Sequence, residues 1–249
     1  MLLILDIGNT NITVGMYRAE KLVKVENIPS DTTLPFETYY KLFYKMVEGY
    51  DISDCMICSV VDEITNLIKD VVDKVCNTDS KILTYKSYSQ IKLKTNKPET
   101  IGADRIANVL YTYKHNLFPA IIVDIGTATT FDVINKNGEF IGGVIMPGIN
   151  LQLIALNLYK SKLPYISLKN SEEAIGYDTE TCILSGVVRG HSCAIEGLYK
   201  QCIKELGYDV KFIGTGGNAP LVAEYMSKKF DITDANLTLE GIRFAYENL

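Results

Sequence analysis

Two stretches of this sequence place an aspartate and a glycine directly after an apolar run. Asp6-Ile7-Gly8 follows residues 2–5, and Asp124-Ile125-Gly126 follows residues 120–123. An apolar run without polar alternation indicates a strand buried on both faces, so each aspartate is expected at the open end of its strand. The glycine lets main-chain N–H groups and nearby hydroxyl groups approach an anion, and the carboxylate suits a hydrated divalent cation that bridges to phosphate oxygens. The repeat therefore predicts two phosphate-binding turns.

A tight β-turn with a polar tip would explain either stretch taken alone. The repetition of the flanking sequence favours the phosphate-binding interpretation, because turns rarely repeat their neighbours by chance. A third glycine-containing turn, at residues 214–217, follows a predicted buried strand at residues 210–213. It suits the nucleoside end of a nucleoside triphosphate, although a strand-to-helix turn explains it about as well.

A fourth stretch with chemical potential is Gly102-Ala103-Asp104-Arg105, at the start of a predicted helix. Adjacent helical residues point about 100° apart, so Asp104 could face a reacting centre while Arg105 grips a carboxylate. An ordinary acid in a first helical turn, next to a surface arginine, explains the same residues. On spacing alone this simpler interpretation is the preferred one.

The elements around these stretches predict a duplicated fold. Each phosphate turn is followed by two β-rich runs, at residues 12–17 and 22–28 and again at residues 130–134 and 139–145. Helices and strands then alternate, whereas a dinucleotide-binding unit would pass from its first strand directly into a helix. We therefore expect an α/β protein with two duplicated ribonuclease-H-like domains, at residues 1–117 and 118–249, with a cleft between them.

Composition narrows the function classes. The chain has 249 residues, a formal net charge of -5 and 47% hydrophobic residues, which argues against binding to nucleic acid or a membrane surface. We expect a cytoplasmic protein, since Asp6 interrupts the first apolar run too early for a signal peptide. The six cysteines do not suggest a disulfide framework, and Cys55 and Cys58 are expected to be buried thiols. Both histidines, His115 and His191, are expected on helix surfaces.

Five motifs together resemble the type III pantothenate kinase family. They are DIGNTNIT at residues 6–13, GADR at 102–105, DIGTATTFD at 124–132, GGVIMPG at 142–148 and GTGGNA at 214–219. The resemblance implies the fold of the acetate and sugar kinase, Hsp70 and actin superfamily. It also implies a transferase that phosphorylates pantothenate with ATP in the first step of coenzyme A biosynthesis. Members of the family work as homodimers and need a monovalent cation, K⁺ or NH₄⁺.

The resemblance also assigns roles to individual residues. Asp104 would be the catalytic proton acceptor, Asp124 would bind the monovalent cation, and Thr179 would contact pantothenate together with Gly102, Ala103, Asp104 and Arg105. ATP would be bound by Asp6, Ile7, Gly8, Asn9, Thr10, Asn11, Ile12, Thr13 and Thr127. Mg²⁺ accompanying ATP would be held through Asp6, as the chemistry of the turn suggests.

Two residues depart from the family pattern. Thr95 stands where the family typically has an aromatic residue against the substrate, and Asp178 stands where it usually has an asparagine before the threonine. These changes affect the expected substrate affinity more than the type of reaction. Two rival functions remain: a phosphatase of the same superfamily, such as an exopolyphosphatase, and a non-catalytic accessory factor in transcription.

Overall fold

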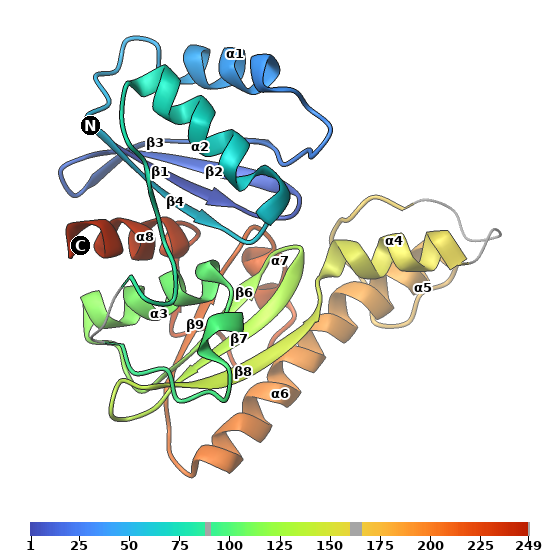
Figure 1. Ribbon diagram of the computed structural model, residues 1–249. Coiled ribbons are helices and arrows are strands. Elements are labelled where there is room, and N and C mark those ends of the chain that lie inside the picture. Colours follow the sequence, from blue (N-terminus) through green and yellow to red (C-terminus); the bar gives the residue numbers. More distant parts are fainter. Residues whose placement is uncertain (88–90, 160–165, 249) are drawn as a thin grey trace. The chain divides into compact units, whose positions relative to one another are not determined.

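Two β-sheets, each in its own structural unit, organise the chain in the computed structural model, which describes residues 1–87, 91–159 and 166–248 (Figure 1). The first unit consists of Met1–His115 together with Leu237–Leu249, and the second of Asn116–Asn236. The change of unit after His115 lies close to the predicted division between residues 117 and 118. The last helix differs from that prediction, because it packs in the first unit.

The first sheet has five strands in the order β3-β2-β1-β4-β5. Strand β1 pairs antiparallel with β2 and parallel with β4, while β2 pairs antiparallel with β3 and β4 parallel with β5. The strands are β1 (Leu2–Ile7), β2 (Asn11–Arg18), β3 (Lys21–Pro29), β4 (Asp54–Ser59) and β5 (Lys81–Ile82). Strand β5 is short, with two residues.

Helices cover both faces of this sheet (Figure 1). Alternate residues of β1, Leu3, Leu5 and Ile7, enter one apolar core with buried residues of the helices on that face. The helices of that face are α1 (Phe36–Val47) and α2 (Asp62–Cys76), and the opposite face carries α3 (Ala103–His115) and α8 (Leu237–Glu247). A short 3₁₀ turn, η1 (Pro98–Thr100), precedes α3.

Helix α8 joins the first unit through its contacts with α3. The hydroxyl group of Thr238 donates a hydrogen bond of 2.9 Å to Oδ1 of Asn108, and both side chains are buried. Nearer the other end of α3, Lys114 forms an ion pair of 2.8 Å with Glu240. Because these partners are far apart in the sequence, helical periodicity alone could not assign α8 to its unit.

The second sheet repeats the topology of the first, in the order β10-β9-β6-β7-β8. Strand β6 pairs antiparallel with β7 and parallel with β9, as β1 does with β2 and β4. The strands are β6 (Ala120–Ile125), β7 (Ala128–Ile134), β8 (Phe140–Pro147), β9 (Lys211–Thr215) and β10 (Ile232–Thr233). The two equivalent sheets confirm the predicted duplication and the α/β class.

The helices of the second unit are α4 (Ile149–Tyr159), α5 (Thr179–Leu184), α6 (Gly190–Leu206) and α7 (Ala219–Glu224). A π-helical turn, η2 (Ser185–Arg189), joins α5 to α6, so α5 and α6 are separate α-helices within one helical span. Helix α7 ends at Glu224, and the amino group of Lys229 donates a hydrogen bond to the carbonyl oxygen of Ala223. A basic side chain is a common partner for the last carbonyl groups of a helix.

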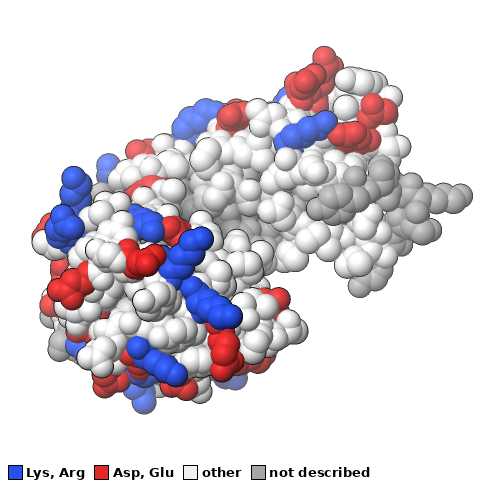
Figure 2. All heavy atoms as spheres, turned by 90° about the horizontal axis from the view of Figure 1, so that it is seen from above, with Lys and Arg blue, Asp and Glu red and all other residues white. Residues whose placement is uncertain are grey.

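Charges of both signs are interspersed on the face of the molecule shown in Figure 2. This distribution accords with the modest net charge of -5. Among the helices in the described ranges, none combines the length and the apolar character that a transmembrane span requires.

Candidate active site

The first predicted phosphate turn joins β1 to β2. Asp6 is half-buried near the end of β1, whereas Asn9, Thr10 and Asn11 are exposed. The main-chain N–H of Gly8 donates a hydrogen bond of 3.0 Å to the carbonyl oxygen of Asn11. This amide is therefore engaged within its own turn, and a phosphate would have to be bound by other groups.

Not every side chain predicted at ATP lies where it could reach a ligand. Ile7 and Ile12 are fully buried in the apolar core, so only their main-chain atoms could contact a nucleotide. Thr13 is half-buried and its hydroxyl group donates to Oδ1 of Asn27 at 2.8 Å. The turn therefore offers Asp6 and the exposed polar residues after Gly8 as its accessible side chains.

Asp6 has a thiol neighbour that the sequence did not reveal as part of the site. Cys58 lies opposite Asp6 in the parallel pairing of β1 with β4, so both side chains lie on the sheet face covered by α3 and α8. The pKa of the Cys58 thiol is raised far above its usual value, first by burial and then by the carboxylates of Asp6 and Asp104. Cys58 is buried as expected, but it lies close to both proposed functional acids of this unit.

Asp104 occupies the first turn of α3 and is half-buried. Its Oδ1 accepts a hydrogen bond of 2.7 Å from the main-chain N–H of Arg105 and lies against Gly102, where any side chain would overlap it. Burial raises the pKa of Asp104, although the N–H and the guanidinium group of Arg105 oppose this rise. A carboxylate with a raised pKa is a stronger base, as a proton acceptor requires.

The second predicted phosphate turn joins β6 to β7 and is held by main-chain hydrogen bonds. The N–H of Gly126 donates to the carbonyl oxygen of Ala128 at 3.0 Å, and the N–H of Gly148 donates to that of Thr127 at 3.0 Å. A Cβ atom at Gly148 would overlap the carbonyl oxygens of Gly126 and Thr127. Only glycine fits there, which explains the last glycine of the GGVIMPG motif.

The third glycine turn lies beside the second within the same unit. Thr215 pairs with Asp124 across β9 and β6, which brings Gly216 next to the half-buried Asp124. The N–H of Asn218 donates a hydrogen bond of 3.2 Å to the carbonyl oxygen of Ile125. Asp124, Thr127 and the GTGG segment are therefore neighbours, whereas the sequence indicated only that each follows a strand.

The expectation for His191 was wrong. This histidine is only 2% exposed and lies between Thr129 and Gln152, because the first turn of α6 packs against the sheet instead of facing water. His115, in contrast, is partly exposed and lies 3.2 Å from Glu240. Periodicity indicated the helix but not which side of it would be covered.

The structure shows the surroundings of Asp178 and Thr95, the two residues that depart from the family pattern. Asp178 is the N-cap of α5, where its Oδ1 accepts from the N–H of Thr181 at 2.7 Å, and these bonds lower its pKa. Thr179 begins that helix and is exposed. Within the described part of the chain, the buried hydroxyl group of Thr95 has no hydrogen-bond partner.

The described residues contain no cluster of three or more histidine, cysteine, aspartate or glutamate side chains that could hold a metal ion. A single carboxylate at a turn is nevertheless a common anchor for Mg²⁺, which takes its remaining ligands from water and substrate phosphates. Asp6 fits this pattern because it is half-buried at the end of a strand beside exposed polar residues.

Comparison with known proteins adds the identity of the family. Residues 2–201 match the family model described as type III pantothenate kinase. This chain belongs to the type III pantothenate kinase family. A type III pantothenate kinase from Dehalococcoides mccartyi (strain CBDB1) is 35% identical over 253 residues, which cover 99% of this chain and 95% of the relative.

Solved structures of lower identity share the fold. A protein of Campylobacter jejuni described as a Baf family transcriptional activator superposes with a TM-score of 0.62 at 19% identity, covering 99% of this chain and 98% of the other. MreB5 of Spiroplasma citri superposes with a TM-score of 0.55 at 12% identity, covering 99% and 96%. These likenesses support the actin/Hsp70-type fold expected for a type III pantothenate kinase, and at these identities they indicate the fold alone.

Proposed function

We propose that this protein transfers the γ-phosphoryl group of ATP to pantothenate, which produces 4'-phosphopantothenate in the first step of coenzyme A biosynthesis. Membership of the type III pantothenate kinase family supports this activity. The observation that carries the proposal is the placement of Asp104. It is a half-buried carboxylate with a raised pKa, and it lies close enough to Cys58 to raise the pKa of that thiol, as Asp6 of the first phosphate turn also does.

Asp104 acts as the proton acceptor in this proposal. As the primary hydroxyl oxygen of pantothenate forms its bond to the γ-phosphorus, the bond from that phosphorus to the β,γ-bridging oxygen breaks and ADP leaves. The hydroxyl proton passes to the carboxylate of Asp104. Its hydrogen bond with the N–H of Arg105 holds the carboxylate in one orientation, so that alignment is established before the substrate binds.

Pantothenate is held in this proposal by residues 102–105 and Thr179. Arg105 suits the pantothenate carboxylate because its guanidinium group can donate two parallel hydrogen bonds. Asp178 serves as a helix cap, a role that asparagine also fills well. The change from asparagine to aspartate is therefore compatible with the local backbone, although it adds a negative charge near an anionic substrate.

The two turns divide the phosphate contacts in this proposal. Polar groups of residues 6–13 and Thr127 hold the phosphates, Asp6 anchors Mg²⁺, and Asp124 binds a monovalent cation, K⁺ or NH₄⁺. Such cations supply positive charge that offsets the charge developing on the phosphoryl oxygens. The absence of a lysine from both turns supports this part of the proposal, because bound cations would then have to supply the positive charge. That both turns meet one triphosphate stays a prediction.

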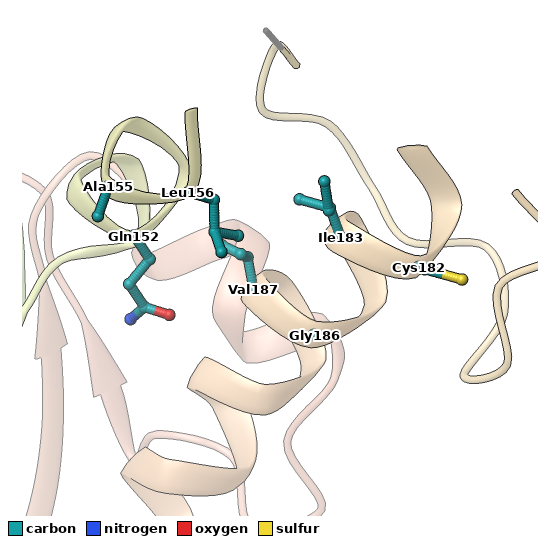
Figure 3. A pocket seen from close by; sticks show the side chains of 7 residues that line it. All are labelled: Gln152, Ala155, Leu156, Cys182, Ile183, Gly186 and Val187. Atoms are coloured by element: carbon teal, nitrogen blue, oxygen red, sulfur yellow. The ribbon is translucent and has the colours of Figure 1, made fainter. Parts of the chain in front are cut away.

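A homodimer is part of the proposal, and α4 offers the best surface for it. This helix contains no charged residue, and Leu151, Ile154, Leu156 and Leu158 are all exposed. An apolar groove separates it from the α5–η2 segment, where Leu156 lies beside Val187 (Figure 3). Exposed apolar residues that gather on one helix often mark an interface, so we propose that a second subunit covers it. The cytoplasmic location predicted from the sequence also remains part of the proposal.

Measurement of ADP release, with and without pantothenate and with and without K⁺, tests the proposed function. The kinase requires release that depends on pantothenate and rises with K⁺. Hydrolysis of ATP that is independent of pantothenate would instead identify a phosphatase. Absence of turnover under every condition would contradict an enzymatic role and favour the accessory factor.

A further inference from the structure

Three buried or half-buried polar side chains form a chain of hydrogen bonds in the second unit. Nε2 of His191, in the first turn of α6, lies 2.9 Å from Oγ1 of Thr129 on β7. Nδ1 of the same ring lies 2.8 Å from Nε2 of Gln152 on α4. Thr129 is fully buried and His191 is only 2% exposed, so water is largely excluded from these contacts.

The orientation of Gln152 determines which nitrogen of His191 carries the proton. Nε2 of Gln152 also donates to the carbonyl oxygen of Pro147 at 3.1 Å, and a carbonyl oxygen can only accept. The amide nitrogen is therefore the group that faces both Pro147 and His191, and Nδ1 of His191 must accept. A neutral ring then carries its proton on Nε2 and donates it to Thr129. Burial lowers the pKa of His191, which favours this neutral form.

The same network reaches the second phosphate turn from two directions. Pro147 precedes Gly148, whose N–H holds the carbonyl oxygen of Thr127, and Pro147 pairs with Ala128 across β8 and β7. His191 holds the side chain of Thr129 from the other side. Residues 127–129 are thus fixed at both ends by groups that are in turn tied to Gln152.

We propose that His191 is a positioning residue for the nucleotide site. His191 orients Thr129 and, through Thr129, the turn at Thr127. Gln152 holds the His191 ring in the Nε2–H tautomer. This inference rests on the proposed function only in taking Thr127 as a phosphate contact. His191 itself touches no substrate in this assignment. Its effect is on how well the turn is ordered before the nucleotide arrives, which reduces the entropy lost on binding.

The first experiment reads the tautomer directly. The chain contains only two histidines, so a long-range ¹H–¹⁵N spectrum of ¹⁵N-histidine-labelled protein shows two rings, and His115 serves as the internal reference. We expect His191 to be neutral with its proton on Nε2 at pH 7, and its signals to shift on addition of MgADP while those of His115 do not. A charged ring, a proton on Nδ1, or signals indifferent to MgADP would each overturn the proposal.

The second experiment separates positioning from folding. We expect His191→Leu to weaken binding of MgATP about tenfold, in line with the loss of one buried hydrogen bond. His191→Gln, whose amide nitrogen can still donate to Thr129, should recover most of this loss. The matched control is His115→Leu, which removes the other histidine from a partly exposed position and should bind MgATP as the unsubstituted protein does.

The kinetic pattern distinguishes this role from a merely structural one. The loss in His191→Leu should raise KM for ATP while leaving KM for pantothenate unchanged. If KM for ATP and KM for pantothenate rise equally in His191→Leu, His191 contributes only to general stability and the proposal is rejected. The same holds if His191→Leu and His191→Gln weaken MgATP binding equally. If the unsubstituted protein binds MgATP but does not phosphorylate pantothenate, the proposed function fails while the positioning role stands.

Discussion

The two phosphate turns occupy the same place in two equivalent sheets, yet their side chains differ in exposure and in what lies behind them. In the first turn Asn9, Thr10 and Asn11 are exposed, and the amide of Gly8 closes the turn onto Asn11. In the second, Thr127 is half-buried and the turn is backed by Gly148 and His191. The main-chain support is the same in both turns, because the N–H of Ser30 donates to the carbonyl oxygen of Thr10 at 3.0 Å, as the N–H of Gly148 does to that of Thr127. The turns differ in the exposure of their side chains and in the buried contact of His191 with Thr129.

The helices that follow the third strand of each sheet show a second contrast. Helix α1 turns Tyr39, Phe43, Met46 and Val47 into the core of its own unit. Helix α4 leaves several apolar side chains exposed instead, among them Leu158 at 73%. Helix α1 therefore packs into the core of its unit, whereas α4 carries an exposed apolar surface.

The largest expected effect comes from substitution of Asp104, the proposed proton acceptor in the first unit. Asp104→Asn should lower turnover by about two to four orders of magnitude, the usual contribution of a general base. The amide can still accept from Arg105, so MgADP affinity should be retained. Single-turnover kinetics and nucleotide titration measure the two quantities. Near-normal turnover would remove Asp104 from the mechanism.

Gly148→Ala tests how far nucleotide binding at the second turn depends on the close approach of Gly148. The added methyl group must displace the carbonyl oxygens of Gly126 and Thr127, so we expect MgATP affinity to fall by at least about tenfold, as for other displaced binding groups. Gly197→Ala is the matched control, because nothing lies within 4 Å of a Cβ at that position of α6. Calorimetric titration of both variants with MgATP tests this. Equal affinities would mean that the second turn does not need its backing.

A charge on α4 tests whether the two helices differ in function. Ile154→Lys, at a side chain that is 45% exposed, should shift the protein toward monomers, because an unpaired charge in an apolar interface is costly. Tyr44→Lys on α1, at a residue that is 56% exposed, should leave the assembly unchanged. Sedimentation velocity over a range of concentrations measures the change. An unsubstituted protein that is monomeric throughout would remove α4 as a subunit interface.

The smallest expected effect concerns stability and pH. Burial raises the pKa of Asp104, so its charged form lowers the free energy of unfolding. This destabilisation is fully present at neutral pH and is relieved as pH falls through the raised pKa. Asp104→Asn should therefore raise Tm at pH 7 by about 2–4 °C, as expected for about 1 kcal/mol in a domain of this size. The gain should shrink in acid. A lower Tm at pH 7 would show that the carboxylate stabilises the fold.

Helix α8 and His191 show where sequence reasoning stopped. The apolar runs before Asp6 and Asp124 and the β-rich runs after each of them predicted the strands of the duplicated fold, because strand burial is a local property. The unit that α8 joins depends on contacts with α3 that periodicity does not encode. The burial of His191 likewise depends on which side of α6 meets the sheet.

By itself the sequence determined the duplication, the α/β class and the residues with chemical potential, since each follows from local periodicity or from a motif. Only the tertiary structure decided that Cys58 lies near both Asp6 and Asp104 and that Gly148 packs against the second turn. It also decided that Gln152 orients His191 toward Thr129. These relations join elements that are distant in the chain, and they arise from strand register and helix packing.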